Sequence, residues 1–231
     1  MKTLLISLLW ILGISQVFGQ FFVQKMAQNQ ITGTQEAYVV LINGDTLRGR
    51  INSINFREDL IRRVTLKHND QKLKLGIGQI LAIGVIPPDR AKYDDAALFP
   101  VLRSMKNKAF IEVLPDDGYV IYERIRLPGR QERYEMAQLL NPGFDSKLKV
   151  YAHPETEDNG YTKISGLAVE GLKDNLHYIS VGGEPVMELR DFQYRKRAFQ
   201  QLYGECEIFK GEKLKWKHFP EHVFAHFQEC K

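Results

Sequence analysis

Long apolar runs and cysteines are scarce in this 231-residue sequence. Its one long apolar run lies at residues 4–14, which excludes a membrane protein with several spanning helices. Two cysteines are too few for a disulfide-dense miniprotein, and 44% hydrophobic residues exclude a disordered chain. The formal net charge of +4 is too small to indicate a partner. The length allows one ordinary domain, or two small ones, with a hydrophobic core.

The sequence also lacks the short motifs of common catalytic and nucleotide-binding sites. It contains no GxSxG nucleophile elbow, no GxxxxGK[ST] phosphate loop and no HExxH zinc motif. Gly76, Gly78 and Gly84 do not follow the GxGxxG spacing of dinucleotide-binding turns. We therefore predict a non-enzymatic protein without a cofactor.

The N-terminal sequence is typical of a secretory signal peptide. Lys2 precedes the apolar run, and Val17 and Gly19 occupy the −3 and −1 positions of a small-residue cleavage site. The run is shorter than the roughly 20 residues that span a bilayer, which favours cleavage over an uncleaved anchor. We expect a signal peptide at residues 1–19, export, and no transmembrane span in the mature protein. The Gln-rich residues 20–36 predict a flexible leader.

Residues 37–88 predict an antiparallel meander of four or five strands. The apolar run AYVVLI leads into Asn43-Gly44, a strong hairpin signal because both residues tolerate positive φ. Asn69-Asp70 predicts a second turn further along the meander. Gly49 in the middle of the returning strand indicates a bulge or a tight curl, as in a small barrel.

Residues 89–189 predict a second β-rich block, and residues 190–231 predict a C-terminal helical segment. The strands expected in the second block span residues 109–114, 119–127, 147–152, 161–169, 175–181 and 185–190. The fold class is therefore mainly β (α+β), with the number of domains left open.

The C-terminal segment predicts helices held together by a disulfide bond. Gly204 ends the first helical pattern, and Pro220 suits the first position of the last helix. The apolar stripe of that last helix consists of Phe219, Val223, Phe224 and Phe227. Cysteines of an exported protein are usually paired, so we predict a bond between Cys206 and Cys230.

Three histidines at a spacing of four, His218, His222 and His226, are the most suggestive candidates for a metal site. One helical face could present such imidazoles to zinc. However, Pro220 places His218 before the helix, and no further ligand is marked. A polar stripe beside the apolar one is favoured, and no metal is predicted.

The acidic clusters Asp94-Asp95 and Glu155, Glu157 and Asp158 do not match a calcium-binding loop and predict solvated loops.

Basic residues form two sets, which favour either a polyanion-binding patch or ordinary solvated strand faces with edge protection. The polyanions that such a patch would bind are envelope polysaccharide, lipid headgroups or nucleic acid. The small net charge favours solvated faces. The first set is Arg48, Arg50, Arg57, Arg62, Arg63, Lys67, Lys72 and Lys74; the second is Arg190, Arg195, Lys196, Arg197, Lys213, Lys215 and Lys217.

The segment VLINGDTLRGRI resembles the first strand pair of Sm-like RNA-binding barrels through Leu41, Gly44 and Gly49. The RNA-contacting residues of that family are not reproduced at residues 53–60. The resemblance therefore implies a strongly bent small barrel and not an RNA-binding function.

A larger part of the chain resembles a broad group of uncharacterised exported proteins of Bacteroidota. The matching features are the signal peptide, a GDTxxGxI strand, a central strand with a Tyr near a turn, and a C-terminal cysteine pair. Here they correspond to Gly44-Asp45-Thr46, Gly49, Ile51, Tyr122, Cys206 and Cys230. The resemblance implies export and a β-rich fold, and no activity.

We therefore expect an exported binding or accessory protein of the periplasm or the extracellular space. The expected partner is envelope polysaccharide or another envelope protein, and not nucleic acid. The alternative is a hydrolase whose site is assembled in space, which predicts a pocket where histidine and carboxylate groups converge.

Overall fold

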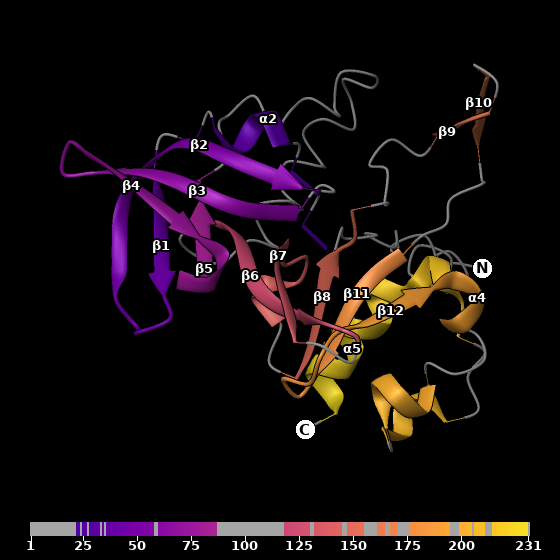
Figure 1. Ribbon diagram of the computed structural model, residues 1–231. Coiled ribbons are helices and arrows are strands. Elements are labelled where there is room, and N and C mark those ends of the chain that lie inside the picture. Colours follow the sequence, from indigo (N-terminus) through magenta and orange to yellow (C-terminus); the bar gives the residue numbers. More distant parts are fainter. Residues whose placement is uncertain are drawn as a thin grey trace, which may run out of the picture.

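The computed structural model shows a mainly β protein with a closed six-stranded antiparallel barrel, a second sheet and a C-terminal helix (Figure 1). This confirms the predicted fold class. The structure describes residues 22–23, 25–26, 28–32, 34, 36–57, 60–86, 118–129, 132–144, 147–154, 161–164, 167–170, 176–194, 199–204, 206–210 and 214–230.

Six strands form the barrel in the order β2-β1-β5-β6-β7-β3, and pairing of β2 with β3 closes it. The strand β4 (Gln71–Gly76) extends the sheet beyond β3, and a 3-10 turn at Ile77–Gln79 connects it to β5. The barrel strands are β1 (Ala37–Leu41), β2 (Thr46–Arg57), β3 (Leu60–His68), β5 (Ile80–Val85), β6 (Val120–Leu127) and β7 (Arg133–Gln138).

The strands β1 to β4 confirm a predicted meander of four strands and both of its tight turns, whereas β5 returns to pair with β1. Gly44 adopts a φ of +91° between β1 and β2, and Asn69 and Asp70 adopt φ values of +48° and +62° between β3 and β4. The barrel also takes β6 and β7 from the second predicted block. The expected strand at 109–114 lies outside the described residues.

The strand β7 escaped prediction because its pattern of polar and apolar residues does not follow its burial. Glu135 and Gln138 are both buried, although their side chains are polar. The Gln138 amide oxygen accepts a hydrogen bond of 2.7 Å from the backbone N–H of Met26. Buried polar side chains of this kind hide the apolar alternation on which strand prediction depends.

Residues 20–36 differ from the predicted flexible leader where they are described. Val23, Met26 and Ile31 are buried in the core of the barrel, and the short helix α2 (Gln28–Ile31) lies in this segment. The Val23 backbone N–H donates a 2.7 Å hydrogen bond to the carbonyl of Leu140. A few apolar side chains in a Gln-rich stretch therefore suffice to pack it against the sheet.

The second sheet has the order β12-β11-β8 and packs between the barrel and the helix α5 (Figure 1). Its barrel side carries Tyr151, whose hydroxyl donates a 2.7 Å hydrogen bond to Glu123 on β6. Lys149 donates to both carboxylate oxygens of the same Glu123 at 2.9 Å. The strands are β8 (Leu148–Ala152), β11 (Leu176–Val181) and β12 (Met187–Arg190). A separate hairpin, β9 (Tyr161–Ile164) and β10 (Leu167–Glu170), replaces the single strand expected at 161–169.

The C-terminal segment contains short helical pieces followed by α5 (Phe219–Glu229). The helix begins one residue before Pro220, and it buries Phe219 and Val223 of its predicted apolar stripe. The shorter pieces are α4 (Asp191–Tyr194), a π-helical turn at Phe199–Tyr203, and 3-10 turns at Glu207–Phe209 and Trp216–His218; another 3-10 turn at Pro142–Phe144 precedes β8. Among the described residues, no helix has the length and apolarity needed to cross a membrane.

The predicted disulfide bond between Cys206 and Cys230 is present. It ties the segment after the π-helical turn to the end of α5 across a sequence separation of 24 residues.

Substitution of Gly49 should destabilise the barrel because β2 passes very close to β3 at this position. A Cβ atom there would lie 2.1 Å from the backbone carbonyl oxygen of Lys67. We expect Gly49→Ala to lower the free energy of unfolding in urea by about 2–3 kcal/mol. Gly78→Ala is the matched control, because its Cβ meets no atom within 4 Å, and it should change stability by less than about 0.5 kcal/mol. Equal stability of the two variants would contradict the close approach.

Reduction of the disulfide bond should lower stability by about 3 kcal/mol, because the unfolded chain regains the entropy of an open loop. Urea unfolding with and without dithiothreitol measures this effect. A Cys206→Ser/Cys230→Ser variant should not respond to the reductant. An unchanged unfolding midpoint of the native protein in dithiothreitol would rule out this contribution.

Candidate functional site

The outward-facing surface of β2, β3 and β4 carries cations that lie opposite one another across three strands. Arg50 pairs in register with Lys67, and Lys67 pairs with Lys72. All three side chains are exposed, whereas the neighbouring Ile51 and Leu66 point into the barrel core. Because cross-strand partners share a face of the sheet, the three charges form one row.

Two further rows continue this surface along the strands. One row joins Ser53, Thr65 and Lys74, and the next joins Asn55, Arg63 and Gly76. Lys74 and Arg63 are exposed. We call the five cations Arg50, Arg63, Lys67, Lys72 and Lys74 the basic face.

Among the described residues, few of the cations on the basic face are neutralised by a carboxylate of the protein itself. Lys67 forms an ion pair of 2.9 Å with Asp70, and its hydrogen bond and positive charge lower the pKa of that exposed carboxyl. Within the described part of the chain, the other four cations form no ion pair. Like charges directly opposite on a sheet destabilise the fold, so this row favours an external anion as its partner.

Arg48 and Arg62 belong to the same predicted basic set but have protein partners. Arg48 lies 3.9 Å from the Glu36 carboxylate and 5.8 Å from the centre of the Tyr38 ring. Arg62 turns to the fully buried Glu135, at 2.8 Å. Within the first predicted set, the described cations that lack a carboxylate partner therefore lie on the basic face.

The second predicted basic set is only partly described. Arg190 is the last residue of β12, and Lys215 and Lys217 are exposed in the C-terminal unit, by which we mean residues 191–230. The others, Arg195, Lys196, Arg197 and Lys213, lie outside the described residues, as do the acidic clusters at Asp94-Asp95 and Glu155, Glu157 and Asp158.

The three histidines of the spacing motif make different contacts. His218 precedes α5, and its ring centre is 6.2 Å from that of His222. His222 Nδ1 lies 2.5 Å from the hydroxyl of Tyr194, and His226 packs against the ring of Tyr203. The described residues include no group of three or more His, Cys, Asp or Glu side chains placed to hold a metal.

Two tyrosines link this histidine contact to the core, and sequence reasoning did not single them out. The hydroxyl groups of Tyr194 and Tyr203 lie 2.9 Å apart, and burial raises the pKa of both phenols. At neutral pH both phenols therefore stay protonated, and the chain from His222 to Tyr203 is a hydrogen-bonded part of the core. The helical spacing of aromatics after residue 190 was the available signal.

His177 is a second histidine that sequence reasoning missed. Its ring stacks on Trp216 at 5.6 Å and on Phe219 at 5.8 Å, between centroids. Burial, followed by the nearby His153, lowers the pKa of His177 to about 4. In the sequence, His177 is one residue of a strand with alternating apolar and polar positions, and this pattern does not predict its aromatic surroundings.

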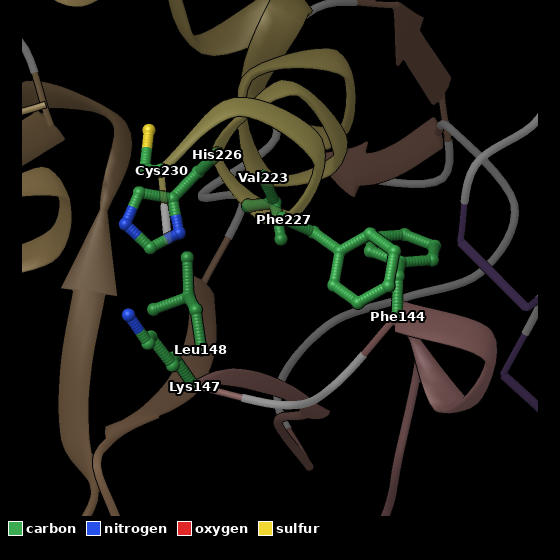
Figure 2. A pocket seen from close by; sticks show the side chains of 7 residues that line it. All are labelled: Phe144, Lys147, Leu148, Val223, His226, Phe227 and Cys230. Carbon is green, nitrogen blue, oxygen red and sulfur yellow. The ribbon is translucent and has the colours of Figure 1, made fainter. Parts of the chain in front are cut away.

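A pocket of about 230 Å³ lies between α5 and the start of β8 (Figure 2). The hydrolase alternative predicts histidine and carboxylate groups converging in a pocket. The described residues that line it include His226 and no carboxylate: they are Phe144, Lys147, Leu148, Val223, His226, Phe227 and Cys230. Among the described residues, this pocket therefore does not bring together the histidine and carboxylate groups that the hydrolase alternative predicts.

Comparisons of the chain with models of protein families, with curated proteins and with solved structures find no match.

The stability of the fold should fall as the pH is lowered towards 4, because His177 takes up a proton more readily in the unfolded chain than in the folded protein. The pKa of His177 is about 4 in the fold and 6.5 in its ordinary state. The unfolded chain therefore binds more protons between these values, so the stabilisation is complete above pH 6.5 and is lost towards pH 4. Urea unfolding across this range should show a shallower pH dependence for His177→Phe than for the native protein. Identical pH dependences would contradict the role of His177.

Proposed function

We propose that this protein is an exported, non-enzymatic binding protein for anionic polysaccharides of the cell envelope. The observation that carries the proposal is the basic face, where Arg50, Lys67 and Lys72 form one cross-strand row. A polymer with regularly spaced carboxylates matches such a row, because each anionic group can meet a different cation.

The surroundings of the cations favour a polysaccharide over nucleic acid or a bilayer. Among the described residues, no large exposed apolar or aromatic side chain lies on β2, β3 or β4. Stacking of bases and insertion into lipid both use such side chains. Ser53, Asn55 and Thr65 instead offer hydroxyl and amide groups beside the cations, which suit hydrogen bonds to sugar hydroxyls.

Export is part of the proposal and has independent support. Residues 1–19 have the pattern of a cleaved signal peptide. The bond between Cys206 and Cys230 is typical of a protein that folds in an oxidising compartment. We also propose membership of the exported Bacteroidota group, on the basis of Gly44-Asp45-Thr46 and the cysteine pair.

Binding to polygalacturonate tests the proposal, with neutral dextran as the control polymer. We expect binding that weakens as salt is added, because electrostatic contacts release counterions. The Lys72→Gln/Lys74→Gln variant removes two cations of the basic face, and its affinity at low salt should fall roughly tenfold. Isothermal titration calorimetry provides the measurement.

The variant Lys215→Gln/Lys217→Gln is the matched control, because it removes two exposed lysines at the same spacing in the C-terminal unit. It should bind polygalacturonate like the native protein. Equal losses in both double variants would show unspecific attraction to a cationic protein and contradict the proposal. Tighter binding of single-stranded DNA than of polygalacturonate would also overturn it, in favour of a nucleic-acid ligand.

A further inference from the structure

The pocket beside α5 combines apolar walls with two nitrogen-bearing side chains. Leu148 and Val223 form part of the wall, and the rings of Phe144 and Phe227 lie 6.1 Å apart between centroids. Figure 2 shows Lys147 and His226 on one side of the pocket and the two Phe rings on the other. The pocket therefore has a polar end and an apolar end.

Within the described part of the chain, the ring nitrogens of His226 have no hydrogen-bond partner, although the residue is largely buried. Only 9% of the residue is exposed, and the aromatic contact of its ring among the described residues is a tilted one with Tyr203, at 5.6 Å between centroids. Burial and the charge of Lys147 lower the pKa of His226, so the ring is neutral at pH 7 and carries one N–H donor. Buried polar groups are normally hydrogen-bonded, so this ring has unused capacity towards the pocket.

Lys147 is the second side chain of the pocket that is available to bind a ligand. It is exposed, and it forms no ion pair within the described part of the chain. None of the described residues that line the pocket carries a negative charge that could neutralise it. An ammonium and an imidazole N–H at the same end of an apolar pocket are complementary to a carboxylate on an apolar body.

We infer that this pocket binds a small monocarboxylate, with its carboxylate between Lys147 and His226 and its apolar tail against Leu148, Val223 and the Phe rings. The volume of about 230 Å³ is below the roughly 300–1,000 Å³ of pockets for drug-sized ligands, so the ligand is a short aliphatic or single-ring acid. The site is separate from the basic face and does not depend on the polysaccharide proposal.

Calorimetric titration with hexanoate, and with its neutral isostere hexanamide, tests this inference. The native protein should bind hexanoate saturably and hexanamide at least roughly tenfold more weakly, because the amide lacks the charge. Lys147→Gln should remove most of this preference. Lys215→Gln, an exposed lysine outside the pocket, is the matched control and should keep it.

A second variant, His226→Gln, distinguishes a direct contact from long-range attraction to Lys147. It should weaken hexanoate binding, while polygalacturonate binding at the basic face remains unchanged. Equal affinities of the native protein for hexanoate and hexanamide would overturn the inference, since they would show an apolar cavity without a carboxylate site. Absence of saturable hexanoate binding, or an unchanged preference in Lys147→Gln, would also overturn it.

Discussion

The pairing of β2 with β3 is the constraint on which the rest of the structure depends. It closes the barrel, so every barrel strand has a hydrogen-bonded neighbour on both edges. Closure assigns each side chain of these strands to the interior or to the surface. Ile51 and Leu66 fill the interior as a cross-strand pair, and the adjacent pair Arg50 and Lys67 must then lie outside. The basic face is thus a consequence of the register that builds the core.

The close approach at Gly49 and the long strand β3 allow this register. Without a side chain, Gly49 lets β2 bend tightly over the backbone of β3. β3 then pairs with β2 on one edge, and with both β7 and β4 on the other. The second sheet covers the outside of β6 and β7, with Glu123 bonded to Lys149 and Tyr151. The barrel therefore has one covered side and one solvent-facing basic side.

Local features of the fold were predictable from the sequence, whereas contacts between distant segments were not. Asn43-Gly44 and Asn69-Asp70 identified hairpins because positive φ is a local property. The disulfide bond between Cys206 and Cys230 followed from expected export and an even cysteine count. The pairings of β5 with β6 and of β3 with β7 join segments far apart in the chain, and no local pattern encodes them.

For the candidate sites, the sequence predicted which residue types are abundant in a segment, but not which of them lie side by side. The sequence shows that Arg and Lys are dense between residues 48 and 74, but the register decides which of them align. It also turns Arg62 away from this surface, towards the buried Glu135. The spacing of His218, His222 and His226 suggested a shared face, whereas His226 lines a pocket together with Lys147 from another part of the chain. The small net charge therefore gives no sign of the cations that align on the basic face.

The most direct test of the central claim is an NMR titration of the protein with a galacturonate oligosaccharide, which follows each backbone amide separately. We predict chemical-shift changes that are concentrated on β2, β3 and β4 and that disappear when salt is raised. Changes centred on the C-terminal unit, or the absence of any change at low salt, would contradict the assignment of the basic face as the polysaccharide-binding surface.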